Sequence, residues 1–161
     1  MRNCSVNPAV VVVVCAVLSV VDGLWAAELG QNTAMKNHGN VPEEEATRAA
    51  VERFNEAFNR HDAEAVAALL TEDTVFEDTS PAPDGRRIEG KAAVAEFWRA
   101  WFARNADARF EAEEMIVSGN RATVLWVYRK MRNGEPWHLR GVDIFTVRDG
   151  KIAAKLAYVK G

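Results

Sequence analysis

Two periods of hydrophobic residues divide the chain into a helical first part and a strand-rich second part. Apolar side chains recur at helical spacing over residues 43–60 and again over residues 91–104, which predicts two amphipathic helices. A short helix through Leu70 is expected between them, because Asp62 can cap its first turn. From Ala108 onward the period changes to two, which indicates that strands follow the helices.

Turn signals predict where the strands begin and end. Two-residue hairpins are indicated where glycine lies beside Asn or Asp between strand-like runs: Gly119-Asn120, Asn133-Gly134 and Asp149-Gly150. They predict an antiparallel meander of four long strands, at residues 108–118, 121–132, 135–148 and 151–160. Earlier in the chain, residues 74–78 are expected to form a short strand, with residues 86–89 as its returning partner.

Asp143 is an acid within an apolar stretch of the third long strand, between Val142 and Ile144. If each hairpin turn has two residues, the cross-strand partners can be counted. Asp143 then lies opposite Val124 on one side and Leu156 on the other. A carboxyl group in such surroundings is hydrogen-bonded, shifted in pKa or functional. A structurally satisfied aspartate is the alternative to a functional one.

The same count predicts which residues surround Asp143 on its face of the sheet. Met115 continues its row, and the next row brings together Trp126, Gly141 and Tyr158, with a gap beside the glycine. A bulge in any strand would move the residues beyond it to the other face. If the register holds, Asp143 lies on an apolar concave face, where burial raises the pKa of a carboxyl group.

Composition and charge exclude several classes of protein. The 161 residues are 48% hydrophobic and 27% charged, which is typical of a single globular domain. A net charge of −3 offers no basic field for nucleic acid, so no nucleic-acid partner is expected. The three histidines have no ligand spacing and no glycine-rich phosphate loop occurs, so neither a metal site nor a cofactor is predicted.

The N-terminal residues predict export. Residues 1–27 combine a basic residue near the start, an apolar core over 9–21 and small residues before a cleavage point, as in a secretory signal peptide. An uncleaved membrane anchor is the alternative. Both cysteines lie in this segment, so the mature chain would have no thiol. We expect a flexible linker over 28–41, a folded domain over 42–161, and a secreted or periplasmic protein without membrane contact after signal cleavage.

Four segments carry a resemblance to known families: residues 58–62 (FNRHD), 69–78 (LLTEDTVFED), 90–97 (GKAAVAEF) and 142–152 (VDIFTVRDGKI). They are similar to the SnoaL-like and ketosteroid isomerase families, and the similarity spans about residues 46–161. The resemblance implies the α+β fold of the NTF2-like superfamily. This fold is a cone in which a curved antiparallel sheet wraps around the N-terminal helices and a third helix.

The resemblance also implies a site built on two acids. Asp78 resembles the general base of ketosteroid isomerase, and Asp143 resembles its protonated oxyanion-hole aspartate, whereas in a cyclase Asp143 itself could be the base. The family's helix tyrosine matches Phe54, which has no hydroxyl, and the register count suggests Tyr158 as a substitute. The substrate-binding residues expected beside these catalytic residues are mostly apolar: Phe54, Phe76, Trp98, Met115, Val124, Trp126 and Leu156.

Two functions stay open from the sequence. The first is an exported, cofactor-free isomerase, dehydratase or cyclase that transfers protons on a small apolar carbonyl compound. The second is a non-catalytic domain on the same fold that binds a hydrophobic ligand or serves oligomerisation. The expected partner is a small hydrophobic molecule. The outer face of the sheet could form a homodimer or simply face solvent.

Overall fold

A computed structural model describes residues 41–160 of the chain, and the predicted signal peptide lies outside them. The elements are α2 (Val41–Asn59), α3 (Ala63–Ala68), β1 (Leu70–Glu77), β2 (Arg87–Glu89), α4 (Lys91–Arg104), β3 (Arg109–Ser118), β4 (Arg121–Arg132), β5 (Glu135–Arg148) and β6 (Lys151–Val159). The predicted linker also falls outside the described part, except that Val41 already begins α2. Among residues 41–160, no helix is both long and apolar enough to cross a membrane.

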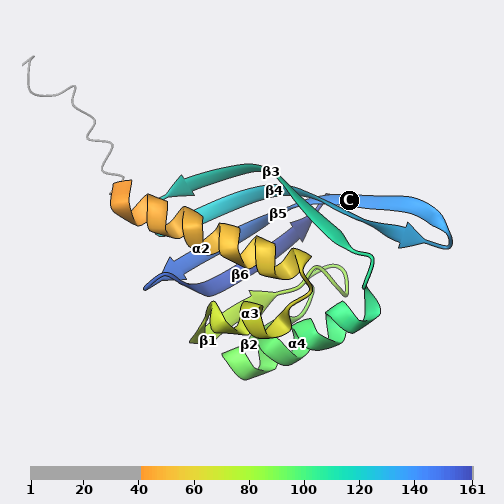
Figure 1. Cartoon of the computed structure of the whole chain (residues 1–161), viewed down its shortest axis with the longest axis horizontal. Helices are drawn as coiled ribbons and strands as arrows, with labels where there is room; N and C mark the ends of the chain where they lie inside the picture. The colour runs from red at the N-terminus through yellow and green to blue at the C-terminus, as the bar shows by residue number, and fades with distance from the viewer. Residues whose placement is uncertain (1–40, 161) are drawn as a thin grey trace, which may run out of the picture. The chain divides into compact units, whose positions relative to one another are not determined.

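The strands form one curved, mixed sheet in the order β2-β1-β6-β5-β4-β3. Helix α2 packs across the inner face of β3 to β6, while α4 packs against β1 and β2, with α3 between the two helices (Figure 1). This confirms the α+β cone. The meander is antiparallel as predicted. Strand β1, however, pairs with β6 in parallel, and this pairing joins distant segments that the hairpin turns cannot predict.

The predicted turns set the register of the long strands. Both residues of the turns 133–134 and 149–150 have positive φ, the conformation that type I′ hairpins require and that favours Asn-Gly and Asp-Gly. Strand β4 pairs with β5 as counted along its whole length, so Val124 lies opposite Asp143, and Met115 lies opposite Val124. Helix α3 also begins as expected, because the Asp62 carboxylate accepts a hydrogen bond from the backbone N–H of Ala65.

The register between β5 and β6 differs from the count. A bulge between Thr146 and Val147 places one extra residue in β6. Beyond it, Asp143 lies opposite Ala157, and the prediction that Leu156 faces Asp143 is wrong. An extra residue reverses the face of every later residue in its strand, so the two faces of β6 are exchanged.

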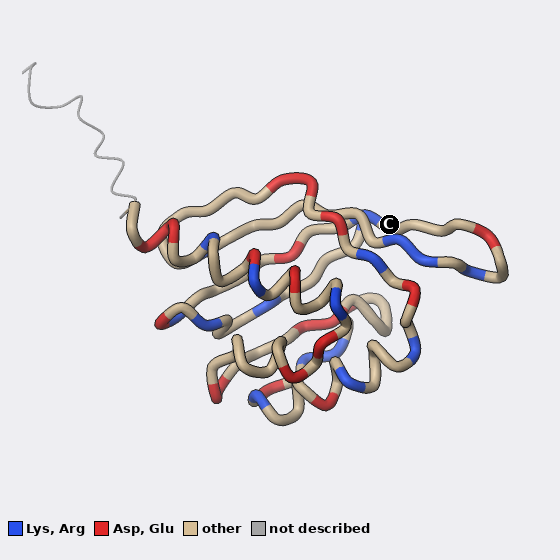
Figure 2. Tube along the Cα trace, viewed as in Figure 1, with Lys and Arg blue, Asp and Glu red and all other residues tan. Residues whose placement is uncertain are grey.

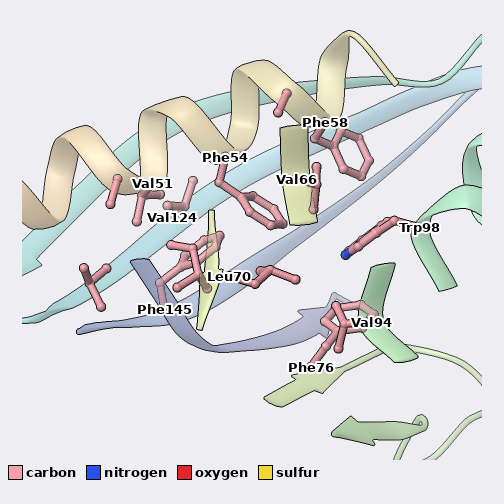
Figure 3. Close-up of a cluster of buried hydrophobic side chains, with 14 of the residues drawn as sticks. Val51, Phe54, Phe58, Val66, Leu70, Phe76, Val94, Trp98, Val124 and Phe145 are labelled. Atoms are coloured by element: carbon pink, nitrogen blue, oxygen red, sulfur yellow. The ribbon is translucent and has the colours of Figure 1, made fainter. Parts of the chain in front are cut away.

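The core lies where the helices meet the inner face of the sheet. Phe54 of α2 is 1% exposed and makes edge contacts with Trp98 of α4, at 6.3 Å between ring centroids, and with Phe145 of β5, at 5.6 Å (Figure 3). This aromatic core continues directly into the wall of a cavity.

Acidic and basic residues are interspersed over the described elements (Figure 2).

Candidate functional site

A cavity of about 700 Å³ opens between the helices and the inner face of the sheet. This volume lies within the range of about 300–1,000 Å³ that small-molecule sites occupy. Aromatic side chains form a large part of its wall, among them Phe54, Phe58, Phe76, Trp98, Trp101 and Trp126. Asp78, Asp143 and Lys155 are polar residues of the same wall, so both acids expected from the sequence reach one cavity.

Asp143 is the most deeply buried charged group of this wall, with 1% of its surface exposed. The Nζ atom of Lys155 lies 2.7 Å from its Oδ2 atom. Neither carboxylate oxygen has a hydrogen bond of regular geometry within residues 41–160. Burial raises the pKa of Asp143, while Lys155 and, more weakly, the Trp126 indole act in the opposite direction. The result is a buried carboxyl group in the lining of the cavity that retains the capacity to accept hydrogen bonds.

Lys155 is a functional candidate that sequence reasoning missed. It is 8% exposed, and its Nζ atom lies 5.3 Å from the ring centroid of Phe76 and 5.6 Å from that of Phe145. The hairpin count places Lys155 on the outer face, whereas the bulge in β6 turns it inward, opposite Phe145. A sequence signal was present, because Lys155 is the one charged residue in the otherwise apolar run from Ile152 to Val159.

Asp78 lies in a different environment at the end of β1. Its Oδ1 atom accepts a hydrogen bond from the backbone N–H of Thr79, and its Oδ2 atom accepts one from Arg86, both at 2.8 Å. The Asp78 side chain is 16% exposed and the Arg86 side chain is 55% exposed. Both oxygens of Asp78 are therefore already hydrogen-bonded, unlike those of Asp143.

Tyr158 does not reach the site. It lies opposite Val142 on the outer face of the sheet and is 51% exposed. The prediction of Tyr158 as a second hydrogen-bond donor is therefore wrong, and the cause is again the bulge in β6. The expected gap beside Gly141 is absent too, because a Cβ atom there would overlap the Trp126 ring and the Tyr158 carbonyl oxygen.

Four of the seven predicted substrate-binding residues line the cavity: Phe54, Phe76, Trp98 and Trp126. The other three do not, and their prediction as cavity residues is wrong. Val124 is completely buried in the core, Met115 borders a separate hollow beside α2, and Leu156 lies opposite Ile144 on the outer face. The alternation of a strand specifies a face of the sheet, but packing against α2 determines which part of that face stays open.

Two indole N–H groups add hydrogen-bond donors that the sequence did not predict as such. The Nε1 atoms of Trp98 and Trp126 are buried and make no hydrogen bond of regular geometry among the described residues. Both side chains line the cavity. Because a buried donor without a partner is costly, an oxygen atom of a bound ligand would satisfy these groups well.

Histidine and carboxylate side chains do not cluster into a metal site in the part of the chain from 41 to 160. The His61 Nε2 atom lies 3.1 Å from the carbonyl oxygen of Ala108, so this histidine makes a structural contact between the α2–α3 turn and the segment before β3. The residues described above make up the candidate site: Asp143, Lys155, Asp78 and the indole donors of Trp98 and Trp126.

Comparison with known proteins places the chain in a family. Residues 51–155 match the SnoaL-like domain, so the chain belongs to the SnoaL-like domain family. This confirms the resemblance expected from the four sequence segments. No functionally curated protein matches the chain.

Solved structures show the same fold. An NTF2-like protein of unknown function from Mesorhizobium loti is 39% identical, with a TM-score of 0.65, and the match covers 74% of this chain and 94% of that one. A proposed polyketide cyclase from Xanthomonas campestris pv. campestris is 26% identical, with a TM-score of 0.59 and coverage of 73% and 93%. A proposed ketosteroid isomerase from Kribbella flavida is 23% identical, with a TM-score of 0.59 and coverage of 74% and 81%, and this similarity concerns the fold alone.

Proposed function

We propose that this protein transfers protons on a small apolar carbonyl compound bound in the cavity, with Asp143 as the base. The observation that carries this proposal is the environment of Asp143. Its carboxyl group is 1% exposed, lacks regular hydrogen bonds in the described chain, and belongs to the lining of a cavity of ligand size. Burial raises the pKa of Asp143, which makes its carboxylate a better proton acceptor than one in water.

The rest of the site supports the same chemistry. Removing a proton beside a carbonyl group places negative charge on the carbonyl oxygen, and preorganised donors stabilise that charge. The buried indole N–H groups of Trp98 and Trp126 supply donors at the cavity wall. Lys155 supplies a positive charge beside Asp143, which favours the ionised carboxylate that a base requires.

Asp78 is the second acid of the proposal, at the end of β1. Because Arg86 and the Thr79 backbone already donate to its oxygens, Asp78 would have to release one of these partners before it could accept a proton. The side chain of Arg86 is 55% exposed, so its release from Asp78 would let the acid serve a later proton transfer or bind a polar end of the ligand.

Isomerisation, dehydration and cyclisation all begin with such a proton transfer. The similarity to a proposed polyketide cyclase supports this group of reactions. Export of the mature protein is part of the proposal and derives from the signal pattern of residues 1–27. A protein that acts outside the cytoplasm without a cofactor would carry out this chemistry with its own side chains.

The test is exchange of the acidic α-protons of 2-tetralone, an apolar bicyclic ketone, followed by NMR in D₂O. We expect the protein to accelerate the exchange and Asp143→Asn to lower the acceleration by about 10²-fold or more, because it removes the general base. Asp149→Asn is the matched control, since Asp149 lies in the exposed β5–β6 turn at positive φ, which asparagine tolerates. Equal exchange by Asp143→Asn and the wild type would contradict the proposal.

Ligand binding without turnover is the second candidate function. The ion pair between Asp143 and Lys155 favours it, because the pair gives the acid a structural role, and Phe54 offers no hydroxyl at the position of the family tyrosine. The same experiment separates the two functions. Quenching of tryptophan fluorescence by 2-tetralone without any acceleration of exchange would identify a binding domain.

A further inference from the structure

Lys155 is a primary amine at the wall of an aromatic cavity. Lys155 is 8% exposed, and it is the one buried lysine within residues 41–160. Its Nζ atom has one carboxylate within ion-pair distance in residues 41–160, that of Asp143, and lies near the rings of Phe76 and Phe145. A lysine desolvated in an apolar pocket is the usual setting of an amine nucleophile.

The Asp143–Lys155 pair can change its charge without exchanging protons with water. In the open cavity the pair consists of an ammonium and a carboxylate 2.7 Å apart. An apolar ligand that fills the cavity displaces water, and keeping two charges in the resulting apolar site becomes costly. Transfer of one proton from Nζ to Oδ2 removes both charges, and it leaves a neutral amine beside a carboxylic acid.

We propose that Lys155 forms an imine with the carbonyl group of the ligand. This inference rests on the proposed function, because it uses the same cavity and the same ligand class. It assigns the site to aldehydes and ketones with an apolar body, and it adds a covalent intermediate to the acid–base chemistry of Asp143.

The step balances with the groups present. The Nζ lone pair attacks the carbonyl carbon, the C=O π electrons move to oxygen, and a proton passes from nitrogen to that oxygen to give a carbinolamine. The Asp143 carboxylic acid then protonates the hydroxyl group, which leaves as water while the nitrogen lone pair forms the C=N bond. The products are a protonated imine at Lys155 and the Asp143 carboxylate.

The protonated imine connects this step to the proposed function. Its positive charge acidifies the neighbouring C–H bonds of the ligand, and the regenerated Asp143 carboxylate lies beside it as a base. Asp143 thus acts twice. As an acid it delivers the proton that releases water, and as a carboxylate it is then ready to accept a proton from the ligand. No oxidant, reductant or further reactant is needed.

The test traps the imine formed with 2-tetralone by reduction with sodium cyanoborohydride, followed by peptide mapping with mass spectrometry. We expect the adduct on Lys155 at an occupancy at least about tenfold above that of any exposed lysine, because an exposed lysine has no apolar pocket that holds the ketone beside its amine. Lys155→Arg keeps the positive charge but cannot form the imine, so it should abolish this adduct. Lys151→Arg, on the exposed start of the same strand, is the matched control and should retain it.

An adduct spread over the exposed lysines without enrichment at Lys155 would overturn the inference. So would an unchanged adduct yield in Lys155→Arg. Both readings come from soluble protein, and the wild-type map decides the matter even if Lys155→Arg does not fold. Failure of the proposed function looks different: Asp143→Asn would then exchange 2-tetralone protons as fast as the wild type, whatever the state of Lys155.

Discussion

Substitution of Lys155 by methionine leaves the Asp143 carboxyl group buried without its positive partner. Methionine keeps much of the length of the lysine side chain and removes the charge. Leaving one member of a buried ion pair alone typically destabilises a protein by about 3–5 kcal/mol. The folded variant can limit this loss by protonating Asp143, which is 1% exposed in the wild type.

Protonation of Asp143 sets a ceiling on the loss of unfolding free energy, and this ceiling depends on pH. Adding a proton to a carboxyl group with an unfolded-state pKa of about 3.9 costs about 1.36 kcal/mol for each pH unit above that value. The ceiling is therefore about 4 kcal/mol at pH 7 and about 1.5 kcal/mol at pH 5. Loss of Lys155 removes the main group that lowers the pKa of Asp143, so the pKa in the folded variant rises further.

The direction of the pH dependence follows from the raised pKa of Asp143. A group whose pKa is higher in the folded than in the unfolded state contributes its full stability below the unfolded pKa, and that contribution is lost as the pH rises toward the folded pKa. We expect Lys155→Met to lose about 3–4 kcal/mol at pH 7 and only about 1–2 kcal/mol at pH 5, relative to the wild type.

Urea unfolding at pH 5, 6, 7 and 8, followed by tryptophan fluorescence, measures this difference. Lys151→Met on the exposed start of β6 is the matched control and should change stability little at any of these pH values. The double variant Lys155→Met with Asp143→Asn has no titrating group at these two positions, so the pair should contribute no pH dependence to its unfolding free energy. A loss from Lys155→Met that is equal at pH 5 and pH 7 would refute the reasoning.

Three further predictions concern individual contacts. Gly141→Ala should destabilise the fold by about 1–3 kcal/mol in urea unfolding, because its Cβ atom would overlap the Trp126 ring. Asp62→Ala should cost about 1 kcal/mol in the same assay, since it removes the cap that accepts from the N–H of Ala65. Trp98→Phe keeps an aromatic ring but removes a buried N–H that has no regular hydrogen bond in residues 41–160, so it should slow 2-tetralone exchange by about tenfold or more, measured by NMR.

Each of these changes has a control of similar chemistry. Gly150→Asn introduces a side chain where there is open space and a positive φ that asparagine tolerates, and Asp84→Ala removes an exposed acid outside the helices. Trp137→Phe changes a cavity-lining indole whose N–H is not among the buried groups without a regular hydrogen bond. Losses as large in the controls as in the test variants would show that the contacts named are not responsible.

Much of the fold follows from local signals in the sequence. The Asn-Gly and Asp-Gly turns fix their own type I′ geometry, and they position Asp143 opposite Val124 through the register of a single hairpin. The parallel pairing of β1 with β6 joins segments far apart in the chain, and no local signal encodes it. The family resemblance supplied the arrangement of the helices and the sheet.

The site was predicted less completely because one residue exchanged the two faces of β6. The run after Ile152 is apolar almost throughout, so its pattern tolerates either face and does not reveal the bulge. The count therefore placed Tyr158 in the site and Lys155 outside it, which is the reverse of the structure. Asp143 was placed correctly, since its β4 neighbour depends only on the regular β4–β5 hairpin.

The central claim concerns the Asp143 carboxyl group at the cavity wall, and its titration by carbon-detected NMR with and without 2-tetralone tests it most directly. We predict a pKa above the value of about 3.9 for a free aspartate, together with a change in the Asp143 carboxyl signal when the ketone binds. The Asp149 signal serves as the internal control and should not respond. A pKa at or below about 3.9 that is unaffected by the ketone would contradict the account.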